Sequence, residues 1–388
     1  MNRHSFQRIY LDHAASAPLK TEVIDAMQAA HAEAGFNPSS THAEGRRTRA
    51  VLDDARERIA AALGASRSEI RFTGSGTEAG NLAVLGAVRA GGGKSHVVTS
   101  AIEHHAVLHA LNGLPNGECE VTVLPVDECG RLDPARFADA IRSDTVLASI
   151  AYANNEVGTV APIAALAEIA HRYGVLFHTD AVQAPGWLPI DVKGLGVDLL
   201  SLSAHKFCGP KGVGVLYVRN GTPISALIAG GGQEFGLRSG TENVAGIAGA
   251  ATALELATAD RTARAPQVGA LRDRLERGIL ATISGVRINA AEAPRLPNLA
   301  SVTFDGVDTE ALLMRLDLEG VAASAGSACA SGAQRPSHVL AAMHSETGGH
   351  ATVRFSLGTA TTQAEIDRVL TILPAIVRSL RRPAATPA

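Results

Sequence analysis

From residue 68 onward, the sequence alternates short apolar runs rich in β-branched residues with longer stretches of helical pattern. Helices are predicted over 77–89 and 163–173, and the strand-like runs are EIRFT, HVVTS, VTVLPV, TVLASIAYA, VLFHTD, VDLLSLS and GVGVLYV. Runs of this kind are typical of strands buried on both faces of a mostly parallel sheet, because each parallel connection needs a crossover helix. The alternation therefore predicts an α/β fold with a mostly parallel sheet flanked by helices.

The remainder of the chain has a different pattern and predicts a second, smaller α+β domain. Strand-like runs (VRIN, ASVTF, ATVRFSL) are mixed with helical ones between residues 267 and 382. The segment RTARAPQ, after a helical region at 244–258, predicts a helix break and a domain boundary. A length of 388 residues suits two domains. We place the large domain at 14–260, the small domain at 1–13 plus 261–382, and a frayed tail at 383–388.

Charge and apolar content exclude several classes of protein. With 35 basic and 38 acidic residues, the net charge is −3, so the chain lacks the cationic field that direct nucleic-acid binding needs. No apolar run reaches the roughly 18 residues of a membrane-spanning helix, and the N-terminus has no apolar signal segment. The cysteines are scattered and form no C-x-x-C pair, which favours reduced thiols and a cytoplasmic location: Cys119, Cys129, Cys208 and Cys329.

Polar residues follow the predicted strands, at the edge where ligands bind to open α/β sheets. EIRFT leads into a GSGT turn at residues 74–77 that opens a helix, and free backbone N–H groups there can hold a phosphate. Taken alone, such a turn more often simply joins a strand to a helix. TVLASIAYA closes with Asn154, Asn155 and Glu156.

A lysine at the end of one buried strand and an aspartate at the end of another indicate a specific cofactor. Lys206 follows VDLLSLS, and Asp180 closes VLFHTD. An amine for a Schiff base and an acid that keeps a pyridine nitrogen protonated are what pyridoxal phosphate needs, beside a phosphate cradle. For Asp180 alone, a structural ion pair is the competing interpretation. The combination predicts pyridoxal 5'-phosphate as cofactor.

A histidine cluster follows HVVTS. His105 and His109 are one helical turn apart, which would suit a metal site, but no further ligand set follows nearby. Solvent-facing helix histidines are therefore favoured, with the ring of His104 turned into the cleft.

Eleven short motifs resemble those of the cysteine desulfurases, pyridoxal phosphate enzymes of fold type I in the class V aminotransferase superfamily. They occur in order between residues 10 and 367: YLDHAAS, NPSSTHAEGR, FTGSGTEAGN, IEHHAVL, ANNEVGT, FHTDAVQAPG, LSAHKFCGPKGVG, GGGQEFGLRSGTEN, SAGSACASG, SHVL and VRFSLGTATTQAEID. The resemblance implies a seven-stranded sheet in a cofactor-binding large domain. It also implies conversion of L-cysteine to L-alanine, with sulfur passed to acceptor or scaffold proteins for iron–sulfur clusters, other thio-cofactors or nucleic-acid sulfuration.

The resemblance also assigns roles to individual residues. Lys206 would be the Schiff-base lysine and the base at Cα, His104 would stack on the cofactor ring and take part in proton transfer, and Asp180 would pair with the pyridine nitrogen. The other implied ligands are Gln183 at the phenolic oxygen, Gly76, Thr77, Ser203 and His205 at the phosphate, Thr241 at the phosphate of the other subunit, and Asn155 and Arg354 at the substrate carboxylate, with Asn155 also beside the cofactor. A role for Thr241 across subunits implies a homodimer.

Cys329 lies in a stretch of small residues, which predicts a flexible, exposed loop at about 323–335 in the small domain. The resemblance makes Cys329 the nucleophile that receives the substrate sulfur as a persulfide. Its GSACASG motif resembles the long-loop branch that includes the iron–sulfur cluster and nitrogen-fixation desulfurases. No resident metal is implied, apart from a transient contact between Cys329 and an iron–sulfur cluster.

Other activities remain open at this point. A selenocysteine lyase or a cysteine or cystine lyase would use the same scaffold, although the loop cysteine argues against both. A sulfur-relay subunit that depends on a partner is a further alternative, since Phe235 stands where many relatives have arginine. Cys208 also departs from the resemblance, at a position that is commonly aromatic.

Overall fold

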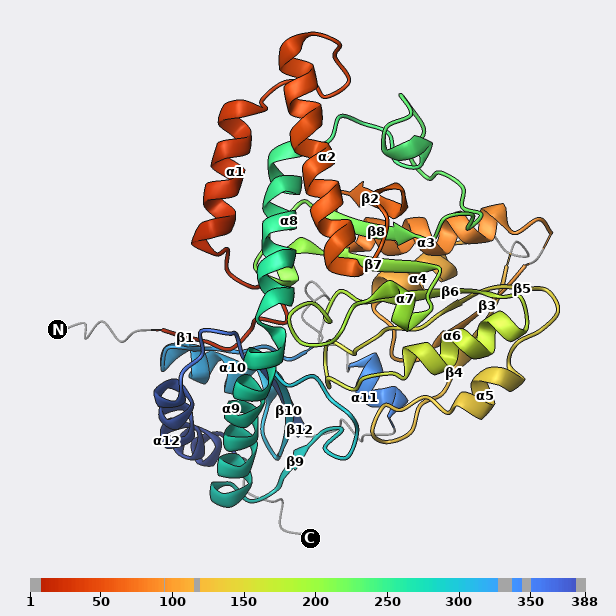
Figure 1. Ribbon diagram of the computed structural model, residues 1–388. Coiled ribbons are helices and arrows are strands. Elements are labelled where there is room, and N and C mark those ends of the chain that lie inside the picture. Colours follow the sequence, from red (N-terminus) through yellow and green to blue (C-terminus); the bar gives the residue numbers. More distant parts are fainter. Residues whose placement is uncertain (1–7, 94, 115–118, 327–336, 344–349, 382–388) are drawn as a thin grey trace.

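The computed structural model describes residues 8–93, 95–114, 119–326, 337–343 and 350–381. Its larger sheet has seven strands in the order β2-β8-β7-β6-β5-β3-β4 (Figure 1). The strands are β2 (Ile70–Thr73), β3 (His96–Ser100), β4 (Glu120–Leu124), β5 (Thr145–Ser149), β6 (Leu176–Asp180), β7 (Leu199–Ser203) and β8 (Gly214–Val218). β8 is antiparallel to both of its neighbours, and the other pairs are parallel. The predicted α/β fold with a mostly parallel sheet is confirmed.

Helices cover both faces of this sheet, which explains why its strands read as continuous apolar runs. Leu199 and Leu200 are neighbours in β7, yet they belong to the cores of opposite faces. One face is covered by α3 (Gly76–Ala90) and α4 (His105–Asn112). The other is covered by α2 (Ala43–Leu63), α5 (Pro134–Asp139), α6 (Ile163–Arg172), α7 (Val192–Leu195) and α8 (Val244–Ala259).

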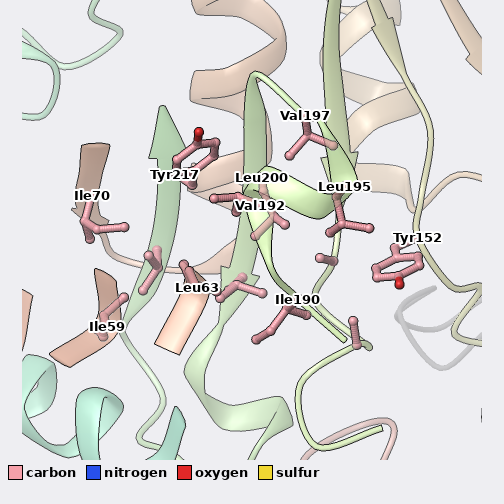
Figure 2. Close-up of a cluster of buried hydrophobic side chains, with 14 of the residues drawn as sticks. Ile59, Leu63, Ile70, Tyr152, Ile190, Val192, Leu195, Val197, Leu200 and Tyr217 are labelled. Carbon is pink, nitrogen blue, oxygen red and sulfur yellow. The ribbon is translucent and has the colours of Figure 1, made fainter. Parts of the chain in front are cut away.

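The core on the second face joins segments that are distant in the sequence. Figure 2 shows Ile59 and Leu63 of α2 beside Ile70 of β2, with Leu200 of β7 and Tyr217 of β8 in the same cluster. Burial of each such aliphatic side chain contributes about 1.5–3 kcal/mol. Helix α1 (Thr21–Glu33) lies outside α2 and α8, where it is drawn in red in Figure 1.

A second, antiparallel sheet forms the lower part of the molecule in Figure 1, in the order β12-β10-β9. Its core includes Ile9 and Leu11, so the N-terminal residues pack with the C-terminal third of the chain. The domain bounds given above stay a prediction. This part contains β1 (Ile9–Tyr10), α9 (Arg261–Thr282), β9 (Val286–Ile288), β10 (Leu299–Asp305), α10 (Thr309–Leu318), β11 (Val321–Ala322), β12 (His350–Ser356) and α12 (Gln363–Leu380), while α11 (His338–Ala342) lies apart from its core.

The predicted helix break at RTARAPQ is wrong. Asp260 alone separates α8 from α9, and α9 continues through Pro266. The carbonyl of Asp260 accepts hydrogen bonds from the backbone N–H groups of Ala263 and Arg264, and its carboxylate pairs with Arg264. Pro266 lies in the second turn, where it removes one helical hydrogen bond that the packing of the remaining turns offsets.

No helix in the described part of the chain is long and apolar enough to cross a lipid bilayer.

Candidate active site

A cavity of about 360 Å³ lies at the carboxyl ends of the parallel strands, where the large sheet meets the second part of the molecule. The turns after β2, β3, β5, β6 and β7 contribute to its wall. It brings together most of the site residues predicted from the sequence: Gly76, Thr77, His104, Asn155, Asp180, Gln183, Ser203, His205, Lys206 and Arg354.

The N-terminus of α3 approaches the end of β7 closely because residue 76 is glycine. A Cβ atom at Gly76 would lie 2.7 Å from the Cβ of Ser203, and the backbone N–H of Gly76 donates to Ser203 Oγ at 3.3 Å. Ser75 caps the helix by accepting a hydrogen bond from the N–H of Glu78. The positive end of this helix, together with the Ser203 hydroxyl, suits a phosphate group.

His205 follows on the same turn and faces the cavity as a neutral ring. Burial, followed by the charges of Lys206 and Lys211, lowers the pKa of His205 to about 4. Its Nδ1 lies 3.3 Å from Ser16 Oγ. At neutral pH, the ring therefore presents a hydrogen bond rather than a positive charge.

Lys206 lies in the 3₁₀ turn η2 (Ala204–Lys206) that ends β7. Its Nζ donates hydrogen bonds to the carbonyl oxygens of Ala14 at 2.8 Å and Ala15 at 2.9 Å. The amide of Gln183 donates to the same Ala14 oxygen at 3.0 Å. The N-terminal segment thus forms one wall of the cavity and orients the lysine amine.

Asp180 ends β6 and accepts a hydrogen bond from the backbone N–H of Val182 at 2.9 Å. Burial raises the pKa of Asp180, and the hydrogen bond from Val182 and the positive charge of Lys206 offset that rise in part. A cationic ring nitrogen placed beside this carboxyl would favour its ionised form. Together with the phosphate cradle and the lysine amine, this donor set fits pyridoxal phosphate.

His104 is the N-cap residue of α4, and its ring orientation is fixed by the backbone. Its Nδ1 accepts a hydrogen bond from the N–H of Ala106 at 3.0 Å. A neutral ring that accepts at Nδ1 carries its proton on Nε2. His104 therefore presents the N–H of Nε2 as a hydrogen-bond donor to the cavity.

Arg354 reaches the cavity from β12 and is only 2% exposed. Its Nη1 donates to the carbonyl of Asn155 and its Nη2 to Asp12 Oδ1, both at 2.8 Å. Within the described part of the chain, the buried Nε has no hydrogen-bond partner. A substrate carboxylate is the kind of acceptor that an arginine with a free donor binds.

Two predicted residues are not part of this arrangement. Thr241 is exposed and lines a separate cavity of about 100 Å³ with Arg238 and Glu242. Cys329 belongs to residues 327–336, which lie outside the described residues. Among the residues that are described, no cluster of histidine, cysteine or carboxylate side chains is arranged to hold a metal ion.

Two buried acids beside the cavity received no role from sequence reasoning. Glu103 is fully buried, and burial raises its pKa to about 8, although its Oε1 accepts hydrogen bonds from Ser100 Oγ and the N–H of Ala151. Glu156 is 6% exposed, and burial raises its pKa as well. Both acids directly follow predicted strands, and this position at the end of a strand is the sequence feature that could have marked them as site candidates.

Comparisons with known proteins give the same assignment along almost the whole chain. The aminotransferase class-V family model matches residues 9–369. The cysteine desulfurase IscS of Dictyoglomus turgidum is 48% identical over 97% of this chain and 96% of its own length. NifS of Azotobacter vinelandii is 44% identical over 96% of this chain and 93% of its own.

Solved structures agree in fold as well as in sequence. A NifS-like protein superposes with a TM-score of 0.90 at 36% identity, covering 96% of this chain and all of the other. A structure of SspA in complex with cysteine gives 0.79 at 35% identity, covering 92% of this chain and all of the other. The chain therefore belongs to the class-V aminotransferase family and, within it, to the cysteine desulfurases.

Proposed function

We propose that this protein is a pyridoxal phosphate-dependent cysteine desulfurase, which converts L-cysteine to L-alanine and passes the sulfur to Cys329 as a persulfide. The observation that carries the proposal is the grouping of a lysine amine, a buried carboxyl and a helix-end phosphate cradle in one cavity. In this assignment Gly76, Thr77, Ser203 and His205 hold the phosphate, Asp180 binds the ring nitrogen, Gln183 and Asn155 contact the ring substituents, and His104 stacks on the ring.

The bound cofactor supplies an electron sink for the charge released at the substrate Cα. Lys206 removes the Cα proton, and the carbonyl oxygens of Ala14 and Ala15 orient its amine. Arg354, whose Nε has no hydrogen-bond partner among the described residues, binds the substrate carboxylate together with Asn155. Holding the carboxylate fixes the direction of the Cα–H bond relative to the lysine.

The sulfur step uses a thiolate of this chain. The Cys329 thiolate attacks the substrate Sγ, so an S–S bond forms and the substrate Cβ–Sγ bond breaks. The electron pair of that bond stays with the substrate carbon, which takes up a proton to become the methyl group of alanine. His104, which carries its proton on Nε2, is the group in the site that donates this proton.

The assembly and the destination of the sulfur follow from the same assignment. The exposed position of Thr241 supports a homodimer in which this residue reaches the phosphate of the partner subunit. IscS and NifS relatives support sulfur delivery to acceptor or scaffold proteins of iron–sulfur cluster assembly. We place the protein in the cytoplasm.

The first test measures products and cofactor together. Purified holoenzyme given L-cysteine and a reductant is expected to yield alanine and sulfide in equal amounts. Cys329→Ala should keep the visible absorbance of the bound cofactor and lose alanine and sulfide formation. Pyruvate in place of alanine would indicate a lyase, and sulfide release by Cys329→Ala at the parental rate would refute the sulfur step. Alanine formation that is absent from the protein alone and begins when an acceptor protein is added would identify a partner-dependent relay subunit.

A further inference from the structure

The chain leaves the described part at Gly326 and returns at Ser337, and both of these residues lie against the carboxyl group of Glu156. Ser337 Oγ donates a hydrogen bond to Glu156 Oε2 at 2.5 Å. A Cβ atom at Gly326 would lie 3.4 Å from the same oxygen. The carboxyl group of Glu156 is therefore hydrogen-bonded to one flank of the segment that contains Cys329 and lies next to the other flank.

Glu156 is itself held firmly by the end of β5. Asn154 Oδ1 accepts hydrogen bonds from the backbone N–H groups of Glu156 at 2.8 Å and Val157 at 2.9 Å. Asn154 Nδ2 donates to the carbonyl of Ile102 at 2.9 Å, which ties this turn to the end of β3. The position of the carboxyl is thus set by the large sheet, although the side chain does not line the cavity.

Further contacts fix the two flanks to the same wall. Ser337 Oγ also accepts from the N–H of Leu340 as the N-cap of α11, and His338 Nε2 lies 2.9 Å from the carbonyl oxygen of Glu103. On the other flank, Arg354 Nη1 is 3.4 Å from the carbonyl oxygen of Gly326. The Gly326 flank therefore lines the cavity together with Arg354, whereas the Ser337 flank is bound to Glu103 and Glu156, which adjoin the lining residues His104 and Asn155.

We propose that Glu156 is a positioning residue for sulfur transfer, which binds the Ser337 flank of the Cys329 segment and packs beside the Gly326 flank, without touching substrate or cofactor. The inference rests on the proposed function, because it needs Cys329 to be the sulfur acceptor. A displacement of about 1 Å from the reactive geometry costs on the order of 10²-fold in rate. Loss of the Glu156 contact therefore acts on the sulfur step and spares proton removal at Cα.

The hydrogen bond needs an oxygen acceptor and does not need a negative charge. Burial raises the pKa of Glu156, and the hydrogen bond from Ser337 and the charge of Arg354 oppose that rise. The side-chain oxygen of glutamine can accept from Ser337 in the same geometry, whereas alanine cannot. Glu156→Gln is therefore the conservative variant and Glu156→Ala the disruptive one.

The experiment separates the two half-steps in holoenzyme. Exchange of the Cα hydrogen of L-alanine in D₂O reports the lysine step, and the single-turnover rate of persulfide formation on Cys329 reports the sulfur step. Glu156→Ala is expected to lower the persulfide rate about 100-fold, with the exchange rate and cofactor absorbance unchanged. Glu156→Gln should restore most of the lost rate.

Two controls keep the inference open to failure. Glu69, another buried acid, contacts the backbone of Ser66 and Asn220, so Glu69→Ala should leave the ratio of the two rates at the parental value. Ser337→Ala removes the hydrogen bond from the other side and serves if Glu156→Ala does not fold. A parental persulfide rate in Glu156→Ala, or an equal loss of both rates, overturns the positioning role. Absence of alanine from parental enzyme overturns the proposed function instead.

Discussion

The two sides of the cavity are built in different ways. The cradle side consists of backbone groups and short side chains at the ends of neighbouring strands and of α3, all fixed by the hydrogen bonds of the large sheet. The side toward residues 327–336 depends on single side-chain contacts, such as that between Glu156 and Ser337, which are 181 positions apart. The cradle thus has a rigid frame, whereas the proposed positioning of the Cys329 segment depends on a few single side-chain bonds.

The largest effect is expected from Lys206→Ala, on the rigid side. The sheet keeps the cradle in shape, but the amine at the substrate Cα is lost, so kcat should fall about 10³-fold. Borohydride reduction followed by peptide mapping should find the cofactor attached to Lys206 in the parental protein and unattached in the variant. Lys211→Ala, at an exposed lysine five positions on, is the control and should keep both activity and attachment.

The cradle side could be predicted from the sequence, because its signals are local. Apolar runs that end in polar residues placed Asp180 and Lys206 at one sheet edge, and the GSGT turn that opens a helix indicated a candidate phosphate cradle at Gly76. The cavity contains all three. Hydrophobic periodicity and the residues at strand ends are enough to predict site residues that lie on neighbouring turns of one sheet edge.

The other side could not be predicted, because its contacts depend on where distant segments meet. Nothing near Glu156 in the sequence indicates that its carboxyl would accept from Ser337. The helix α9 was missed for a related reason: Pro266 is a local signal against a helix, and tertiary packing overrides it. Thr241 lines a cavity of its own in the single chain, so its predicted role requires a second subunit.

Arg354→Lys tests the boundary between the two sides. Lysine keeps the positive charge but lacks the separate guanidinium donors, of which Nη1 holds Asn155 and Nε is proposed to bind the substrate carboxylate. The loss of one hydrogen bond to a charged group, about 1.5–3 kcal/mol, should raise KM for L-cysteine roughly 10- to 100-fold. Cofactor absorbance should not change. A fall in kcat at constant KM would show that the arginine acts on the sulfur step instead.

Gly76→Ala tests how rigid the cradle is. The added methyl would lie 2.7 Å from the Cβ of Ser203, and neither atom belongs to a flexible side-chain end. Overpacking of this kind costs about 1–3 kcal/mol, so the dissociation constant of the cofactor should rise about tenfold. Gly80→Ala in the same helix meets no atom within 4 Å and should stabilise the protein by up to about 1 kcal/mol. Equal cofactor affinity in the two variants would contradict a tight cradle.

The smallest expected effect is a pair of opposed pH dependences. His178, in β6, lies between Ser149 Oγ and Ser201 Oγ, and burial lowers its pKa from 6.5 to about 3. Between pH 6.5 and 3, His178 is therefore protonated in the unfolded chain and neutral in the folded chain, so the stability of the fold decreases as the pH drops through this range. Glu103, whose carbonyl oxygen lies near His338, behaves in the opposite sense: its pKa rises from 4.5 to about 8, so stability falls as the pH rises between these values.

Between pH 5 and 6 the two contributions oppose each other, at about 1 kcal/mol per pH unit each. Urea unfolding of the holoenzyme followed by circular dichroism can separate them. Relative to the parental protein, Glu103→Gln should gain stability as the pH rises through this window, because the histidine contribution is left uncompensated. His178→Gln, whose amide can still bond to the two serines, should lose stability over the same window. If the plots of unfolding free energy against pH ran parallel for all three proteins, neither His178 nor Glu103 would keep its neutral form in the fold. The cradle side of the cavity would then differ from the Glu156 side only in its hydrogen bonds.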